Sequence, residues 1–281
     1  MTMNFDLLRR FFKETPFQPA TSLWRAIEID VVLSRPFPPG RGMDLGCGDG
    51  KLMKTITDHV GRRELVGVDI DPLETGQASA LGLYDTVHTT SGGRIPEPED
   101  SFDFVFSNSV LEHIDTIGDV LDEVSRVLKP GGKFVFTVPS KYFHACLTGP
   151  WLPATSRSAY LDEIDRRCAH KRYWGVELWE QELARRGLRV SDHVEYLTVN
   201  EVRRWENISR LTAGILYLAF GKRRQPIDIQ RSLGLRKSKS SVPNALAVMA
   251  SKMLAIGLNR SSPSAGPFGC VLVESVKVVS N

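Results

Sequence analysis

The sequence is poor in cysteine and contains no long uninterrupted hydrophobic run. Its four cysteines are Cys47, Cys146, Cys168 and Cys270. They lie far apart in the sequence and form no CxxC pair, which argues against a disulfide framework or a zinc site. No run reaches the about 18 apolar residues of a membrane-spanning helix. The opening residues MTMNFDLLRRFFKE lack the apolar stretch and cleavage site of a secretory signal. We therefore expect a cytoplasmic protein without a resident metal.

A strong excess of charge of one sign is also missing. The 36 Lys and Arg residues nearly balance the 33 Asp and Glu residues, and a net charge of +3 is too small to indicate nucleic-acid binding. The apolar share of 42% and the charged share of 25% are ordinary for a soluble globular protein. The 281 residues are enough for one large domain, or for one domain with a substantial insertion.

What the sequence does contain is a regular alternation of short apolar runs with helical periodicity. Helices are predicted at residues 5–14, 20–33, 51–60, 73–81, 117–128 and 176–186, and strands at GMDL, ELVGVDI, 86–90, 102–107, KFVFTV, 188–199 and 269–279. Residues 129–132, KPGG, are expected to end the helix before KFVFTV. The stretch 140–175 is predicted to be rich in loops. This order indicates a Rossmann-like, doubly wound α/β fold with a mostly parallel seven-stranded sheet.

The pattern divides the chain into three parts. Residues 1–36 form an N-terminal helical cap, residues 37–199 and 268–281 form the Rossmann-like core, and residues 200–267 form a helical insertion before the last strand. The α/β alternation does not require the insertion, so we expect it to serve as a lid, a dimer contact or a membrane contact.

The sharpest motif is MDLGCGDG at residues 43–50, between the first strand and the helix after it. Glycines 46, 48 and 50 allow a tight turn and a close approach of the backbone to a ligand, and the helix start offers free N–H groups. Asp69 ends the next strand, where a carboxylate can bind ribose hydroxyls. A dinucleotide enzyme would share these features, but its loop is GxGxxG, whereas this loop is GxGxG followed by Lys51.

The GxGxG loop resembles motif I of the class I S-adenosylmethionine-dependent methyltransferases. VGVDID is similar to their ribose-binding motif, and FDFVFSNSVLEHI is similar to the motif of their fourth strand. LDEVSRVLKPGGKFVFTVPS resembles the helix and strand that follow in the small-molecule branch. The resemblance covers residues 40–140 closely and implies S-adenosylmethionine as the cofactor.

The resemblance also implies roles for particular residues. The backbone at Gly46 and Gly48 would hold the amino-acid end of the cofactor, Asp69 its ribose, and Asn108 would lie beside the methyl-bearing sulfonium. The family often has an acidic adenine contact after the third strand, where this chain has VHTTSGG and Thr90 takes that place. The predicted cofactor-binding residues are Asp44, Gly46, Cys47, Gly48, Asp69, Ile70, Thr90 and Asn108. Asp71, which precedes Pro72, is instead expected to cap a helix.

Methyl transfer to a hydroxyl needs a base, and three histidines lie where loops should surround the cofactor: His113, His144 and His170. His113 is the first candidate, although it could equally be a helix-start residue that only hydrogen-bonds the backbone. Glu112-His113 could also suggest a metal site. A metal-dependent relative would have Glu at position 109, which is Ser here, so no metal is expected.

The insertion combines apolar segments with a basic linker. Leu211, Ile215, Leu216, Leu218 and Phe220 mark the first apolar segment, and Val248, Met249, Met253, Leu254 and Ile256 mark the second. Residues 222–240 between them hold seven Lys and Arg residues against the single acid Asp228. Such a combination suits peripheral contact with an anionic membrane. A lid or homodimer interface with a solvated loop is the alternative.

These features predict a methyltransferase that acts on a small, hydrophobic or lipid-linked acceptor, with O-methylation favoured. The alternative is a non-catalytic S-adenosylmethionine-binding or regulatory module on the same fold. No nucleic-acid partner is expected, because SNSVLEHI does not supply the Pro-Pro-Tyr-type motif that nucleic-acid methyltransferases carry after the fourth strand.

Overall fold

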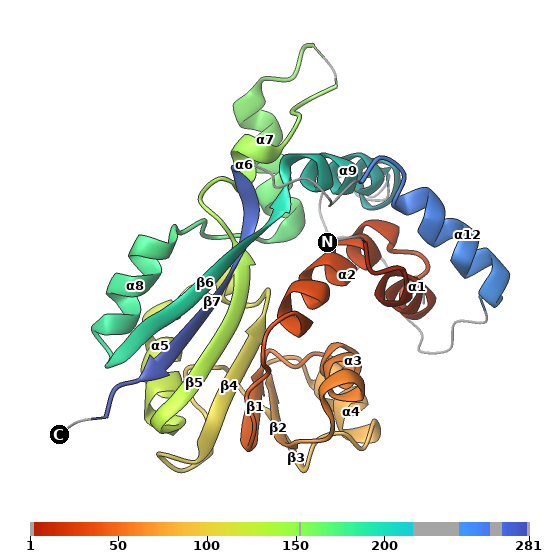
Figure 1. Cartoon of the computed structure of the whole chain (residues 1–281). Coiled ribbons are helices and arrows are strands. Elements are labelled where there is room, and N and C mark those ends of the chain that lie inside the picture. Colours follow the sequence, from red (N-terminus) through yellow and green to blue (C-terminus); the bar gives the residue numbers. More distant parts are fainter. Residues whose placement is uncertain (1–2, 152, 216–241, 259–265, 280–281) are drawn as a thin grey trace. The chain divides into compact units, whose positions relative to one another are not determined.

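Seven strands form one sheet in the order β3-β2-β1-β4-β5-β7-β6 (Figure 1). The computed structural model describes residues 3–151, 153–215, 242–258 and 266–279. The strands are β1 Arg41–Leu45, β2 Glu64–Asp69, β3 Thr86–Thr89, β4 Phe102–Asn108, β5 Leu128–Pro139, β6 Leu188–Thr198 and β7 Phe268–Lys277. The pairs β1–β2, β2–β3, β1–β4 and β4–β5 are parallel, and β5–β7 is antiparallel. The predicted doubly wound, mostly parallel fold is therefore confirmed.

Helices connect these strands largely where the periodicity predicts them. They are α1 Phe5–Glu14, α2 Pro19–Leu33, α3 Lys51–Val60, α4 Pro72–Ala80, η1 Leu111–His113 (3₁₀), α5 Ile117–Val127, α6 Phe143–Cys146, α7 Arg157–Cys168, α8 Val176–Ala184, α9 Val199–Ser209, η2 Arg210–Gly214 (a π-helical turn) and α12 Asn244–Leu254. The Asp71 side chain accepts a hydrogen bond from the Leu73 N–H at the start of α4, as expected of a cap.

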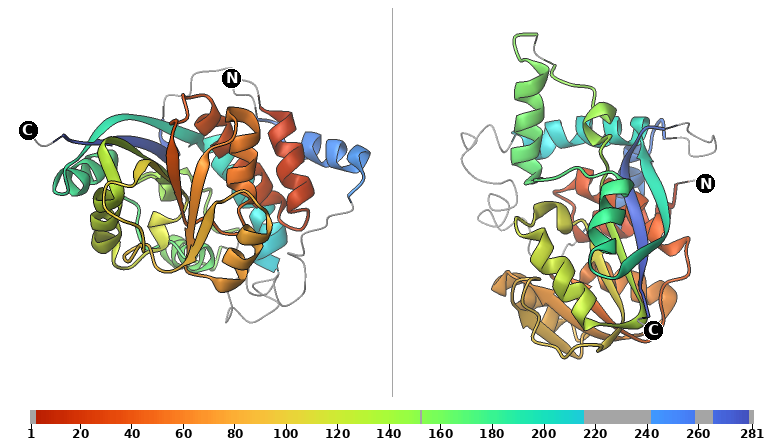
Figure 2. Two further views of the ribbon diagram at one scale, coloured as in Figure 1. Left: turned by 90° about the horizontal axis from the view of Figure 1, so that it is seen from below. Right: turned by 90° about the vertical axis from the view of Figure 1, so that its left-hand side faces the viewer.

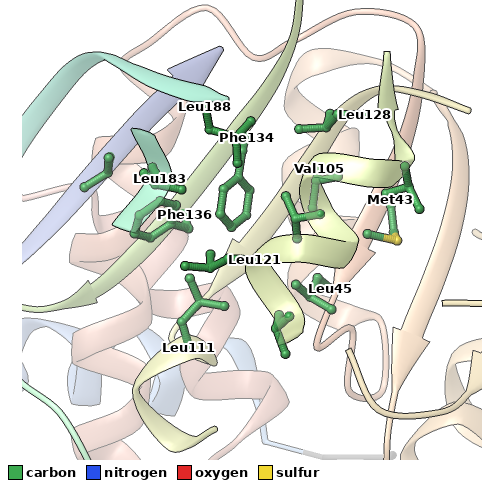
Figure 3. Close-up of a cluster of buried hydrophobic side chains, with 14 of the residues drawn as sticks. Met43, Leu45, Val105, Leu111, Leu121, Leu128, Phe134, Phe136, Leu183 and Leu188 are labelled. Atoms are coloured by element: carbon green, nitrogen blue, oxygen red, sulfur yellow. The ribbon is translucent and has the colours of Figure 1, made fainter. Parts of the chain in front are cut away.

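The main core lies between the sheet and the helices α5 and α8 (Figure 3). The apolar residues of α5 recur at helical spacing and are fully or almost fully buried, which places one stripe of this helix on the sheet. Phe134 and Phe136 of β5 pack together in this cluster, and Phe136 also contacts Trp179 of α8. Helices α3 and α4 lie on the other face of the sheet (Figures 1 and 2).

The chain forms two compact units. The sheet unit consists of residues 32–141, 171–195 and 270–281, and the helical unit consists of residues 1–31, 142–170 and 196–269. The predicted roles of the N-terminal cap and of the insertion stay predictions.

The helical unit has an aromatic core of its own. The Trp24 ring centroid lies 5.3 Å from that of Trp205 and 5.8 Å from that of Phe143. The fully buried carboxylate of Glu206 accepts hydrogen bonds from the Tyr160 hydroxyl, at 2.6 Å, and from the Thr148 N–H, at 2.8 Å. Such pairing offsets the desolvation of a buried charge, so Glu206 stabilises this unit rather than forming a reactive group.

The helix before β5 ends directly ahead of KPGG, one residue short of the expected Leu128, and KPGG itself lies within β5. Helix α5 ends at Val127, and β5 begins at once with the buried Leu128. The register then jumps from Phe102 opposite Leu128 to Phe104 opposite Lys133, so residues 129–132 form an irregularity within β5. Burial of Leu128 against the core explains why the strand begins before the Pro-Gly-Gly segment.

The stretch 140–175, predicted to be rich in loops, contains the helices α6 and α7. The buried residues of α7 are Tyr160, Ile164 and Arg167, a narrow stripe that gives a weak hydrophobic pattern. Helix α9 begins at Val199, at the start of the predicted insertion. Thr198 and Glu201 form a reciprocal capping box there, and the T-x-x-E spacing in the sequence is the pattern that could have predicted it.

Part of the insertion lies outside the described residues. Leu216, Leu218 and Phe220 of the first apolar segment, and the basic linker 222–240, are among these positions. Within the described ranges, no helix combines the length and the apolar character needed to cross a bilayer.

Candidate functional site

The predicted cofactor-binding residues all belong to the sheet unit and lie at or just after the carboxyl ends of parallel strands. Strands β1, β2, β3 and β4 run in the same direction, so their carboxyl ends share one edge of the sheet. Strand β1 lies between β2 and β4, and the order of strands reverses there. Open α/β sheets bind ligands at such a reversal.

Backbone hydrogen bonds hold the glycine loop against β2. The N–H groups of Gly46 and Cys47 both donate to the Val68 carbonyl, at 2.7 and 3.0 Å. The Gly48 N–H donates to Oδ2 of Asp69 at 2.9 Å. The loop after β1 and the carboxylate at the end of β2 therefore form one rigid arrangement.

The three glycines of the loop differ in what surrounds them. All have positive φ: +79° at Gly46, +52° at Gly48 and +78° at Gly50. A Cβ at Gly46 would lie 2.3 Å from a Val110 methyl group, and one at Gly50 would lie 2.9 Å from the Tyr84 ring. At Gly48 the nearest atom is a Glu74 carboxylate oxygen at 3.9 Å. Gly48 therefore borders open space that a ligand can enter.

Asp69 combines a structural role with capacity for a ligand. Its Oδ1 accepts a hydrogen bond from the Asp71 N–H at 2.9 Å, and its Oδ2 accepts the one from Gly48. Each carboxylate oxygen has a second lone pair, so the half-buried side chain can also accept ribose hydroxyls. Beside it, Ile70 and Leu73 are 73% and 67% exposed, which provides apolar surface at the same edge.

Asp44 lies beneath the loop, where it is 4% exposed, and receives a 2.6 Å hydrogen bond from the Tyr84 hydroxyl. Burial raises the pKa of Asp44 to about 7; the Tyr84 hydrogen bond lowers it and the charge of Asp69 raises it further. Burial likewise raises the pKa of the Cys47 thiol, which keeps this thiol protonated. Sequence reasoning missed Tyr84, because no local pattern links it to Asp44.

The end of β4 is fixed by its two neighbours in the sheet. The buried Ser107 hydroxyl donates to the Leu45 carbonyl at 2.9 Å. The Ser109 N–H donates to the carbonyl and hydroxyl oxygens of Thr137, at 3.0 and 3.1 Å. Asn108, 7% exposed, lies between them, and Ser109 turns the chain with φ of +50°. The backbone on both sides of Asn108 is therefore fixed by hydrogen bonds to β1 and β5.

A cationic residue that sequence reasoning missed holds the segment after β4. The Arg172 guanidinium donates to the carbonyls of Leu111 and Ile114 and lies 5.4 Å from the centroid of the Trp174 ring. The Lys171 N–H donates to the Glu112 carbonyl at 2.9 Å. Residues 171–174 thereby fix the short helix η1, which carries His113.

The three candidate bases are divided between the units. His113 is in the sheet unit, with a side chain that is 38% exposed and Nε2 at 3.8 Å from a Glu112 carboxylate oxygen. His144 and His170 are in the helical unit. His144 Nε2 lies 2.8 Å from Oδ1 of Asp165, and the His170 ring packs edge-on against Phe143 with the ring centroids 5.7 Å apart.

Thr90, the predicted adenine contact, donates its hydroxyl to the Arg94 carbonyl at 2.9 Å.

Residues 43–136 match the family described as "Methyltransferase domain". This range contains the glycine loop, Asp69 and the end of β4. The matched residues form a class I S-adenosylmethionine-dependent methyltransferase domain. Membership of this family implies S-adenosylmethionine as the cofactor.

Curated relatives of this methyltransferase domain act on different acceptors. The dimethylglycine N-methyltransferase of Parasynechococcus marenigrum is 35% identical over 127 residues, which cover 43% of this chain and 45% of the relative. The 24-methylenesterol C-methyltransferase 2 of Oryza sativa is 36% identical over 104 residues, which cover 35% and 28%. The chain thus spans less than half the length of these two relatives.

Solved structures share the fold over most of the chain. An S-adenosylmethionine-dependent methyltransferase of Thermotoga maritima has a TM-score of 0.55 at 14% identity, covering 96% of this chain and 99% of its own. The [4+2]-cyclase SpnF also has a TM-score of 0.55, at 18% identity, covering 89% and 80%. At these identities the likeness concerns the fold alone.

Proposed function

We propose that this protein transfers a methyl group from S-adenosylmethionine to an oxygen atom of a small, hydrophobic or lipid-linked acceptor. The observation that carries this proposal is the open space outside Gly48, beside the Asp69 carboxylate and next to β4 at the reversal of strand order. The relatives named for dimethylglycine and for a sterol both act on small molecules, which supports this class of acceptor.

The residues at this edge fit the proposed cofactor. When bound, S-adenosylmethionine supplies a methyl group already activated on a sulfonium, so the protein mainly has to align the acceptor. Gly48 lets the backbone approach the ligand, and Asp69 accepts hydrogen bonds from ribose hydroxyls. Ile70 offers apolar contact, and its high exposure leaves it accessible. Asn108, at the end of β4, would lie nearest the reacting group.

Calorimetric titration with S-adenosylmethionine and S-adenosylhomocysteine tests the cofactor site. The wild type is expected to bind both, and Asp69→Ala is expected to weaken binding at least about tenfold, because hydrogen bonds to a charged group contribute roughly 1.5–3 kcal/mol each. Asp58→Ala is the matched control, since Asp58 is an exposed carboxylate on α3 that pairs with Lys54. Equal affinities for both variants, or no binding by the folded wild type, would contradict the proposal.

Replacement of each candidate histidine by alanine tests the proposed transfer to oxygen. The assay follows labelled methyl transfer from S-adenosylmethionine to a panel of hydrophobic phenols and alcohols. Loss of a general base is expected to lower kcat about a hundredfold, because base catalysis contributes roughly 10²–10⁴. The same variant should lose the fall in rate at low pH that the wild type shows. If all three variants keep the wild-type pH profile, transfer to an unactivated hydroxyl is the wrong reaction.

A second candidate is a non-catalytic or regulatory module that binds the cofactor. A fold shared with the [4+2]-cyclase SpnF, a protein named for other chemistry, does not by itself specify methyl transfer, so this candidate is tested beside the first. The two candidates differ in product. A methyltransferase releases S-adenosylhomocysteine when a suitable acceptor is present, whereas a binding module retains S-adenosylmethionine unchanged.

A further inference from the structure

Helix α12 presents two apolar faces, of which only one is packed. Ala247, Ser251 and Leu254 are buried and recur at helical spacing, and α12 lies alongside α1 in the helical unit (Figure 1). Leu246, Met249 and Met253 follow a different helical face and are 52%, 55% and 58% exposed. Ile256 continues this second face just beyond the helix and is 64% exposed. We call Leu246, Met249 and Met253 the outer face of α12.

The structure holds α12 in place while its outer face stays exposed. The Arg204 side chain of α9 donates to the carbonyls of Met253 and Leu254, with Nε 3.1 Å from the latter, which satisfies acceptors at the carboxyl end of the helix. The outer face is therefore a surface that is already ordered. An ordered apolar surface loses little conformational entropy when it meets a partner.

Charge in this part of the chain indicates the chemistry of the partner. Within α12 the single charged residue is Lys252, which is exposed and lies three positions after Met249. In the sequence, residues 211–267 contain nine Lys and Arg against one Asp, which leaves 27 Lys and Arg against 32 Asp and Glu in the rest of the chain. The basic excess of the protein is thus concentrated in the sequence that contains α12.

We propose that the outer face of α12 docks on the surface of an anionic lipid bilayer. Leu246, Met249 and Met253 would enter the boundary between headgroups and acyl chains, and Lys252 would meet anionic headgroups. A second copy of the chain fits less well. A two-fold symmetric contact between two outer faces would bring both Lys252 side chains into one largely apolar interface, where like charges are unfavourable. The inference is independent of the methyl-transfer chemistry.

Flotation of the full-length protein with vesicles tests this docking. Vesicles of phosphatidylcholine containing about one third phosphatidylglycerol are expected to carry the wild type upward, and pure phosphatidylcholine vesicles are not. Replacing Leu246, Met249 and Met253 together by Gln should lower the partition coefficient about a hundredfold, because most of the inserted apolar surface is lost. Lys252→Gln should lower it about fivefold, the contribution of one cation at such a surface.

The matched control is Leu178→Gln, which removes an exposed leucine from α8 of the sheet unit and should float like the wild type. Circular dichroism and S-adenosylmethionine binding show whether the triple variant remains folded, and a folded triple variant that floats like the wild type overturns the proposal. Failure of the wild type to float overturns it as well. If the triple variant instead abolishes dimers in sedimentation experiments without lipid, a second copy is the occupant.

Discussion

Gly48→Ala is expected to leave the protein folded and to weaken S-adenosylmethionine binding about a hundredfold. The added methyl group would have only the Glu74 carboxylate within 4 Å, at 3.9 Å, so it projects into the space proposed for the cofactor. The φ of +52° costs an alanine roughly 1–2 kcal/mol of folding stability, which a domain of this size tolerates. Calorimetric titration and thermal unfolding of the same preparation measure the two effects.

Gly46→Ala is the matched variant and is expected to show the opposite balance. Its Cβ would lie 2.3 Å from a Val110 methyl group, and φ at this position is +79°. Overpacking and backbone strain together should lower the free energy of unfolding by roughly 3 kcal/mol or more. A stable Gly46→Ala protein, or a Gly48→Ala protein with wild-type affinity, would mean that the open side of the loop is wrongly assigned.

Asp44→Asn is expected to make the protein more stable at alkaline pH and to leave its stability at acidic pH unchanged. The pKa of Asp44 is raised from 3.8 to about 7, so the folded state binds this proton more tightly than the unfolded state does. The free energy of unfolding contributed by this group therefore falls as pH rises from about 4 to about 7. Asn stays neutral at every pH and can still accept the Tyr84 hydrogen bond. The variant therefore keeps the free energy of unfolding that the wild type loses on ionisation of Asp44. This difference is at most about 4 kcal/mol.

The pH dependence of cofactor affinity is a second test of the Asp44 carboxyl group. A sulfonium bound at the proposed site would favour ionised Asp44, so affinity for S-adenosylmethionine should increase from about pH 6 to about pH 8, and more than affinity for the uncharged thioether of S-adenosylhomocysteine. Asp44→Asn should remove this dependence. Tyr84→Phe should move it to higher pH, because the Tyr84 hydrogen bond lowers the pKa of Asp44. An unchanged slope in Asp44→Asn would assign the titration to another group.

The local patterns of the sequence predict much of the sheet unit. Residues 51–60 were predicted as a helix from apolar spacing, and α3 has these bounds. The prediction that Asp71 caps a helix is confirmed by its hydrogen bond to the Leu73 N–H. Both features depend on residues only a few positions apart, where sequence spacing translates directly into geometry. The glycine loop belongs to the same class of feature, since its turn is encoded within eight residues, MDLGCGDG.

The features that escaped prediction depend on contacts between distant residues. Tyr84 meets Asp44 from 40 positions away, and Arg172 holds the Leu111 carbonyl from 61 positions away. Neither residue type is unusual in its own neighbourhood, so only the folded sheet brings the partners together. Helix α7 was missed for another reason. Its buried stripe includes Arg167, and a charged residue on a buried face hides the apolar periodicity.

The insertion lies at a position where a change in its length costs little chain entropy. Strands β6 and β7 are neighbours at the edge of the sheet, and the whole segment 199–267 joins the end of one to the start of the other. Compared with a turn of about four residues, closing a loop of roughly 70 residues costs only about 2.5 kcal/mol of chain entropy. The length and composition of this segment can therefore change at little cost in chain entropy. The proposed cofactor site can therefore stay unchanged while the segment 199–267 changes.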